Sequence, residues 1–264
     1  MTNLNILIVE GNDPKNSEFF KRAARASCSE NLKNLVLKLE PNSKIDIINP
    51  TRDDETKAAL ENIKNYHGVI FTGGAMRLND MTDEIKKHIN FASSCFKQDN
   101  KILAICWGLQ VCSVAAGGKV APGKNGAHIC IASDIEIKEE GEKNPIYKNK
   151  KLKFTSPAFN YDEVCEIPPG ATLLSSDKIN KIMGLYFKSG NSKIWGLQYH
   201  PDYEYWQMIN LSSARKDRIL ENNHFNDETE FQNHLDFIKD EEKKLDFENR
   251  TCEVRNWLNY IKIN

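Results

Sequence analysis

Apolar residues in the first 105 positions fall into short runs that are separated by longer amphipathic stretches. The runs have the length and composition of strands that are buried on both faces of a parallel sheet. They cover residues 4–9, 44–48, 68–71 and 101–105. The stretches between them carry apolar residues at helical spacing, and the first is interrupted near residues 27–29. We expect helices over residues 15–38, 53–65 and 81–96.

Strands that alternate with helices form right-handed βαβ units, which predicts a doubly wound, mostly parallel α/β sheet. In such sheets ligands bind beyond the carboxyl ends of the strands. Those ends are occupied here by Glu10 and Gly11, by the segment 72–74 and by Cys106. We therefore expect these three positions to converge on one crevice.

The second half of the chain has a different pattern of apolar and polar residues. Short β-like pieces are separated by turn residues, at 135–137, 152–154, 163–165, 172–174, 182–187 and 193–198. Beyond them the chain is helical and rich in charge but keeps regularly spaced apolar residues, which is typical of amphipathic helices packed on a domain. We predict one domain over residues 1–205 and a helical C-terminal extension over residues 206–264.

Composition narrows the class of protein. The 264 residues are 40% hydrophobic and 28% charged, with a formal net charge of −1, which is ordinary for a globular protein and gives no argument for nucleic acid. No apolar run reaches the roughly 18 residues of a membrane helix, and no secretory signal stands at the N-terminus. The seven scattered cysteines form neither a Cys-x-x-Cys pair nor a cluster with histidine. We expect a cytoplasmic protein with reduced thiols that uses no metal and no cofactor.

Cys106 stands where the strand 101–105 gives way to a helical pattern that ends at Gly117 and Gly118. A thiol at a helix N-terminus faces unpaired backbone N–H groups and the positive end of the helix dipole, both of which favour the thiolate. Cysteine is also a common core residue. From this stretch alone, Cys106 is equally well interpreted as a nucleophile or as packing.

A cysteine nucleophile needs a base and a group that orients the base. His200 follows a buried-looking strand, and Asp202 and Glu204 stand close enough to accept from its ring. Of the other histidines, the one at 128 lies in a glycine-rich loop and is ambiguous. We interpret the remaining four, at 67, 88, 224 and 234, as surface residues.

Gly73 and Gly74 have two interpretations. They can form a tight turn after the strand 68–71, or their N–H groups can face a developing oxyanion together with the N–H of Trp107. The order Gly-Gly, cysteine, histidine strengthens the second interpretation.

Three segments together resemble the class I (triad) glutamine amidotransferases, whose pattern is Gly-Gly, Cys-x-Gly-x-Gln and His-Pro-Glu. They are Thr72-Gly-Gly74, Cys106-Trp-Gly-Leu-Gln110 and His200-Pro-Asp202. The likeness runs from Leu4 to about Tyr205 and is strongest to stand-alone proteins similar to the glutamine amidotransferase domain of GMP synthase. It implies a flavodoxin-like fold.

The resemblance also implies a mechanism. Cys106 would attack the side-chain amide of glutamine and His200 would shuttle the proton, so that a γ-glutamyl thioester and ammonia form. Gly73, Gly74 and Trp107 would supply the oxyanion hole. Residues Gly108, Gln110, Asp162 and His128 would shape the substrate pocket.

Three departures from the family pattern affect how far the family's residue roles apply to this chain. Asp202 replaces the family's glutamate, which makes Glu204 a rival orienter, and position favours Asp202. Asn160 stands where relatives carry a histidine before the aspartate, and His128 stands where close relatives have a glutamate. The last two changes affect the identity of the substrate more than the chemistry.

Three functions remain open from the sequence. The first is a glutamine amidotransferase or amidohydrolase that releases ammonia and glutamate, with a separate ammonia-accepting synthase as partner, because the chain carries neither a pyrophosphatase loop nor a P-loop of its own. The second is a γ-glutamyl peptidase or hydrolase that acts on another γ-glutamyl amide. The third is a catalytically silent protein with a binding or regulatory role. We expect an enzyme, because cysteine, histidine and carboxylate all persist.

Overall fold

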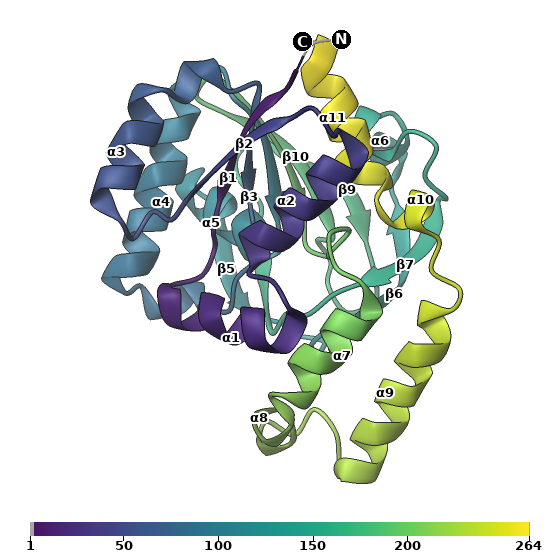
Figure 1. Cartoon of the computed structure of the whole chain (residues 1–264). Coiled ribbons are helices and arrows are strands. Elements are labelled where there is room, and N and C mark those ends of the chain that lie inside the picture. Colours follow the sequence, from purple (N-terminus) through teal and green to yellow (C-terminus); the bar gives the residue numbers. More distant parts are fainter. Residues whose placement is uncertain (1–2, 264) are drawn as a thin grey trace.

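A mixed β-sheet runs through the middle of the computed structural model, which describes residues 3–263 (Figure 1). The strands are β1 (Asn5–Val9), β2 (Lys44–Ile48), β3 (Gly68–Phe71), β4 (Lys101–Ile105), β5 (Lys119–Pro122), β6 (Ile131–Ile137), β7 (Lys153–Pro157), β8 (Asp162–Glu166), β9 (Thr172–Ser176), β10 (Gly184–Ser189) and β11 (Ser192–Leu197). The main sheet has the order β2-β1-β3-β4-β11-β10-β9-β6-β7, and β5 pairs with β8 in a separate ribbon.

The sheet is parallel in one half and antiparallel in the other. β2, β1, β3, β4 and β11 pair in parallel, while β10, β9, β6 and β7 continue the sheet in antiparallel pairs. The carboxyl ends of β3, β4 and β11 therefore lie side by side at one edge. This arrangement confirms the doubly wound, mostly parallel α/β fold that the apolar runs predict.

Helices cover both faces of the sheet (Figure 1). They are α1 (Pro14–Ala24), α2 (Cys28–Leu39), α3 (Asp53–Glu61), α4 (Asp83–Phe96), α5 (Trp107–Ala115), α6 (Glu139–Glu142), α7 (Tyr205–Ser213), α8 (Lys216–Glu221), α9 (Glu228–Glu242), α10 (Phe247–Arg250) and α11 (Cys252–Ile263). Side chains alternate along a strand, so Ile6 and Ile8 pack in one apolar cluster with α2 and α11. Leu7 packs in a second cluster with α3, α4 and α5.

The predicted helix over residues 15–38 is two helices, and the break lies where the sequence indicates it. Ser27 caps α2: its hydroxyl accepts from the Glu30 N–H at 3.3 Å, while the Glu30 carboxylate accepts from the Ser27 N–H at 2.9 Å. This reciprocal capping box satisfies two backbone donors that the start of a helix leaves unpaired.

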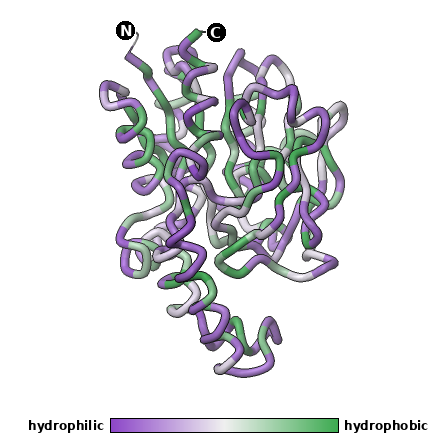
Figure 2. Tube along the Cα trace, turned by 90° about the vertical axis from the view of Figure 1, so that its right-hand side faces the viewer, coloured by the Kyte–Doolittle hydropathy of each residue, from purple (hydrophilic) through white to green (hydrophobic). Residues whose placement is uncertain are grey.

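The C-terminal helices divide between two of the three apolar clusters in the structure. α7, α8 and α9 extend from the carboxyl edge of the sheet and pack with α1 in a third cluster (Figure 1). In contrast, α11 returns to the sheet, where Trp257 and Ile261 pack in the cluster that holds β1 and α2. Hydrophobic positions concentrate along the strands in the interior (Figure 2). The division at residue 205 stays a prediction. Among the described residues, no helix is long and apolar enough to cross a membrane.

Candidate active site

Cys106 occupies a sharp turn between β4 and α5. Its φ of 51° and ψ of −109° are unusual for a residue with a side chain, and such strain concentrates at sites where a side chain must be held in place. The turn fits closely against β3, because a Cβ on Gly108 would lie 2.4 Å from the Phe71 carbonyl oxygen. The Cys106 Sγ lies 3.6 Å from the Phe159 carbonyl oxygen and 3.5 Å from Nε2 of Gln198.

His200 stands just beyond β11, and its backbone N–H donates to the Pro157 carbonyl at 2.7 Å. The buried imidazole is hydrogen-bonded to Asp202, with Nδ1 and Oδ1 3.1 Å apart, and the charge of Cys106 also acts on it. Burial alone would lower the pKa of His200. The charges of Cys106 and Asp202 outweigh it, and they raise this pKa from 6.5 to about 10. This geometry favours the imidazolium form of His200.

The two carboxylates near His200 have different surroundings. Asp202 is buried, and its backbone carbonyl accepts from Nδ2 of Asn31 at 2.7 Å, which fixes the segment. Glu204 is half-exposed; its Oε2 accepts from the indole of Trp206 at 2.7 Å, and its other oxygen pairs with Arg250 at 3.3 Å. The structure therefore brings Asp202, and not Glu204, against the imidazole.

Gly73, which follows β3, packs closely against His200 and Cys106. A Cβ on Gly73 would lie 2.6 Å from Cε1 of His200 and 3.7 Å from Cβ of Cys106, so only glycine fits there. Trp107 is the first residue of α5, and its N–H has no acceptor inside the helix. With Gly74, these positions surround the space next to the thiol, where an oxyanion would form.

One histidine that was expected on the surface is fully buried. His88 of α4 packs edge-on against Trp107, with ring centroids 4.8 Å apart, and burial lowers its pKa from 6.5 to about 4. The surface prediction for His88 was wrong because its position, three residues after Ile85 and four before Ala92, lies on the apolar side of α4. The imidazole is neutral and supports the ring of Trp107.

A second polar group lies along the cavity wall. Nε2 of Gln110 donates to the Asp162 carbonyl at 2.8 Å and to Oε1 of Gln198 at 3.3 Å. The Asp162 carboxylate forms a bidentate pair with Arg77, over 2.7 and 3.1 Å. The sequence prediction missed Arg77 and Gln198, because neither stands in a motif and each acquires its partner only through the fold.

His128 is buried behind this wall. Its Nδ1 lies 3.0 Å from Oδ1 of Asn160 and its Nε2 lies 2.8 Å from the Asp177 carboxylate. Among the described residues, Asn160 lines the cavity and His128 does not. His128 therefore reaches the pocket only through Asn160, which itself donates to the Asp162 carbonyl at 3.1 Å.

These groups open into one cavity of about 210 Å³ at the carboxyl edge of the sheet. Thiol, imidazole and the Asp162–Arg77 pair form one part of its lining, and the remainder includes side chains of α1, α7 and α8 and of the loop before β8. Within the described residues, no group of His, Cys, Asp and Glu is arranged to hold a metal ion. The site has parts needed for nucleophilic attack on an acyl group: a thiol, and a proton carrier with its orienting carboxylate. The oxyanion hole at Gly73, Gly74 and Trp107 stays a prediction.

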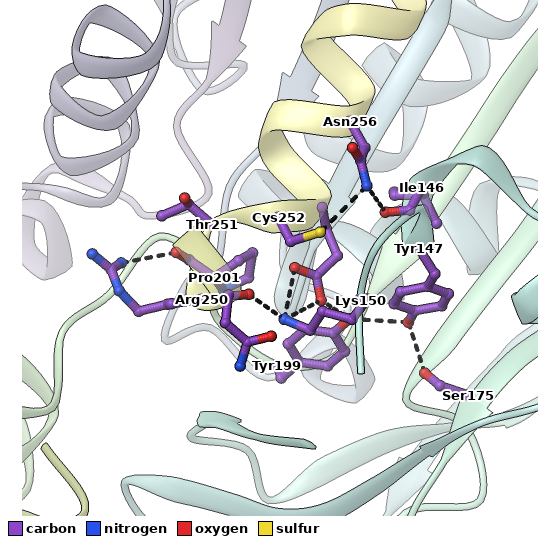
Figure 3. A network of polar contacts seen from close by, with 12 residues as sticks. Ile146, Tyr147, Lys150, Ser175, Tyr199, Pro201, Arg250, Thr251, Cys252 and Asn256 are labelled. Carbon is purple, nitrogen blue, oxygen red and sulfur yellow. Dashed lines mark hydrogen bonds and ion pairs between the residues drawn. The ribbon is translucent and has the colours of Figure 1, made fainter. Parts of the chain in front are cut away.

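The C-terminal helices hold the segment that carries His200 (Figure 3). Arg250, which is buried, donates to the carbonyls of Pro201 at 2.9 Å and of Tyr203 at 3.1 Å. These carbonyls flank Asp202, so one guanidinium fixes the backbone on both sides of the carboxylate. The sequence prediction did not identify Arg250 as part of the site.

On the other side of His200, Tyr199 enters a buried polar network (Figure 3). Its hydroxyl donates to Glu253 of α11 at 2.7 Å, and Glu253 pairs with Lys150 at 3.1 Å. Burial and the nearby charge of Glu253 raise the pKa of Tyr199 well above 10, so the hydroxyl keeps its proton. The residues before and after the imidazole are therefore both anchored to the C-terminal helices.

Comparisons with known proteins agree with this geometry. The family model for class I glutamine amidotransferases matches residues 24–208. A γ-glutamyl-L-1-hydroxyisopropylamide hydrolase from a Pseudomonas species is 25% identical over 100% of this chain and 95% of its own. A glutamine-hydrolysing GMP synthase component from Methanococcus vannielii is 30% identical, over 59% of this chain and 72% of its own. Gamma-glutamyl peptidase 5 of Arabidopsis thaliana is 32% identical, over 54% and 56%.

Solved structures share the fold. A glutamine amidotransferase from Thermotoga maritima superposes with a TM-score of 0.71 over 99% of both chains, at 18% identity. One from Methylobacillus flagellatus gives a TM-score of 0.62 over 99% of this chain and 95% of its own, at 15% identity.

Proposed function

Since the chain belongs to the class I glutamine amidotransferases, we propose that it cleaves the γ-amide of glutamine through the thiol of Cys106. The products are ammonia and glutamate. One observation carries the proposal: a cysteine in a strained turn shares a cavity with a buried histidine, and its charge helps to raise the pKa of that histidine to about 10.

In the first half of the reaction, the Cys106 thiolate attacks the γ-carbonyl carbon and forms a tetrahedral intermediate. The N–H groups of Gly73 or Gly74 and of Trp107 stabilise the oxyanion. His200 gives its proton to the departing nitrogen, so ammonia leaves and a γ-glutamyl thioester remains. In the second half, His200 takes a proton from water, which attacks the thioester and releases glutamate.

The γ-glutamyl group is zwitterionic at its α-carbon and needs both charges in its pocket. The paired Asp162 and Arg77 offer a carboxylate for the α-ammonium and a guanidinium for the α-carboxylate. Gln110 holds the Asp162 backbone in place, and the absence of a side chain at Gly108 lets the turn approach β3. His128 acts from behind the wall through Asn160.

The test measures ammonia and glutamate from glutamine, together with the mass of the protein after rapid acid quench. We expect turnover and a γ-glutamyl adduct on Cys106, and we expect Cys106→Ala to lose both while it keeps its melting temperature. Cys165→Ala is the matched control, because this thiol is exposed on β8 and lies outside the cavity lining. Turnover that survives in Cys106→Ala would refute the mechanism. Wild-type protein that forms no adduct with any γ-glutamyl amide would favour the catalytically silent binding protein.

A second candidate is a γ-glutamyl hydrolase for amides larger than glutamine. The observation that favours it is the part of the cavity formed by α1, α7 and α8, which extends past the thiol. The relative that matches the whole chain is named for such an amide. Release of an amine instead of ammonia separates the two candidates in the same assay.

A separate ammonia-accepting synthase remains a proposed partner of this chain. Relatives that are named as one component of a GMP synthase support a partner of that kind. We propose a cytoplasmic location, since all seven cysteines are free thiols.

A further inference from the structure

The cavity continues from Cys106 into a region that glutamine does not need. Four aromatic side chains line this region: Phe19 and Phe20 from α1, and Phe159 and Tyr161 from the loop before β8. We call them the aromatic wall. The wall begins at the nucleophile itself, because the Phe159 carbonyl lies 3.6 Å from Sγ of Cys106. Whatever leaves from the γ-carbon therefore departs next to apolar surface.

A guanidinium is held within this apolar region. The Cζ of Arg215 lies 4.6 Å from the ring centre of Phe19, 5.0 Å from that of Phe20 and 5.7 Å from that of Phe159. Cation–π contacts keep the side chain in place, and Arg215 is among the residues that line the cavity.

No carboxylate in the described residues pairs with the Arg215 guanidinium. The groups that act on its charge are Tyr161, Cys28, Arg218 and Tyr203. Arg218 also lines the cavity, so this end carries two positive charges without a negative one. Arg77 lines the same cavity but is already paired with Asp162. The excess charge at the aromatic end is suited to an anion that arrives with the substrate.

We propose that the leaving group is an α-amino acid with an apolar or aromatic side chain, and that Arg215 binds its carboxylate. This inference rests on the second candidate for the proposed function, the γ-glutamyl hydrolase for larger amides, and it names the amine of that amide. The side chain of the leaving amino acid packs on the aromatic wall. The α-carboxylate pairs with the guanidinium, and the nitrogen of the scissile bond lies near His200.

The chemistry keeps the same steps. Cys106 forms a bond to the γ-carbon, the C–N bond breaks, and His200 supplies the proton that makes the departing nitrogen a neutral amine. Water then cleaves the thioester. One γ-glutamyl amino acid and one water give one glutamate and one free amino acid, and nothing is oxidised or reduced.

The test compares kcat/KM of the wild-type protein for four substrates: γ-glutamyl-phenylalanine, γ-glutamyl-phenethylamide, γ-glutamyl-glycine and glutamine. The phenethylamide lacks only the carboxylate of the phenylalanine compound. The glycine compound lacks the aromatic side chain. A charge-assisted hydrogen bond is involved, so we expect the phenethylamide to be roughly 10- to 100-fold poorer than the phenylalanine compound. The glycine compound should also be poorer, because it leaves the aromatic wall uncovered.

Variants of Arg215 test whether this residue causes the preference for the substrate with the carboxylate. We expect Arg215→Gln to raise KM for γ-glutamyl-phenylalanine roughly 10- to 100-fold and to lower kcat/KM for the phenethylamide far less. Arg215→Lys keeps the charge and should fall between the two. Arg25→Gln is the control, since this arginine also lies over an aromatic ring, that of Trp206, but is exposed and outside the cavity lining.

Failure of the subsite and failure of the proposed function give different results. Equal kcat/KM with and without the carboxylate, or an equal loss on both compounds in Arg215→Gln, overturns the subsite while glutamine hydrolysis persists. Absence of any Cys106-dependent hydrolysis overturns both.

Discussion

The ion pair between Lys150 and Glu253 gives a quantitative test of how α11 supports the active site. Both side chains are almost fully buried, at 1% and 0% exposure, and the Lys150 ammonium also donates to the Asn249 carbonyl at 2.5 Å. Lys150→Met keeps the volume of the side chain and removes its charge. Glu253 is then a buried carboxylate with the Tyr199 hydroxyl as its remaining hydrogen-bond donor.

Breaking a buried pair by removing one partner costs about 3–5 kcal/mol, because an uncompensated charge stays in the interior. For a chain of this size each kcal/mol lowers Tm by roughly 2–4 °C, so the expected loss is on the order of 6–20 °C. The double variant Lys150→Met/Glu253→Gln should recover much of this loss, because no charge is left unpaired. In the folded fraction, kcat should fall more than KM changes, since Tyr199 precedes His200.

Thermal unfolding followed by circular dichroism measures the shift, with steady-state kinetics below the transition. Lys243→Met is the matched control: its ammonium pairs with Asp240 at 2.8 Å on an exposed surface, where the pair contributes little. If Lys150→Met and Lys243→Met change Tm equally, or if the double variant is no more stable than the single one, the buried pair does not hold α11 against the sheet.

Four further substitutions test the site. Asp202→Asn should lower kcat on the order of 10²–10⁴-fold with little change in KM, whereas Glu204→Gln should have a small effect on kcat. Steady-state kinetics measures both variants. If Glu204→Gln has the larger effect on kcat, Glu204 is the orienting carboxylate. Gly73→Ala places a methyl group 2.6 Å from Cε1 of His200, so kcat should fall at least about tenfold while Tm changes little, and unchanged kcat would contradict the close approach. Burial lowers the pKa of His88 from 6.5 to about 4, so below pH 6.5 the unfolded chain binds a proton that the folded chain does not, and about 3 kcal/mol of stability is lost as the pH falls to 4. His88→Phe should remove this part of the acid sensitivity in urea unfolding at pH 7 and pH 4.5, and equal pH slopes for variant and wild type would show that His88 is not its source.

The fold of the first half could be predicted because the apolar runs in the sequence there match the strands that are buried in the structure. Strands such as β1 and β4 are buried on both faces, so each is a continuous apolar run that a single sequence reveals. The antiparallel half is less clear: β6 begins at Ile131, but its exposed Ser133 and Asp134 interrupt the apolar pattern, and only residues 135–137 were predicted.

Some residues of the site could likewise be predicted from the sequence, and others could not. Cys106 and His200 follow strands directly, so their convergence follows from the parallel sheet. Arg77, Arg215 and Arg250 come from segments with no motif, and their contacts arise from elements far apart in the chain. A sequence taken alone gives no reason to choose them among 36 basic residues.

The contact between β1 and α11 has a consequence for how the chain is made. Leu4 and Ile6 share an apolar cluster with Trp257 and Ile261, and a Cβ on Gly68 would lie 2.6 Å from the Trp257 ring. The ribosome must therefore release nearly all of the described chain before this face of β1 is covered. Until then the nascent sheet exposes apolar surface that a chaperone can bind. Closure over such a long sequence separation also makes folding slow relative to local helix formation.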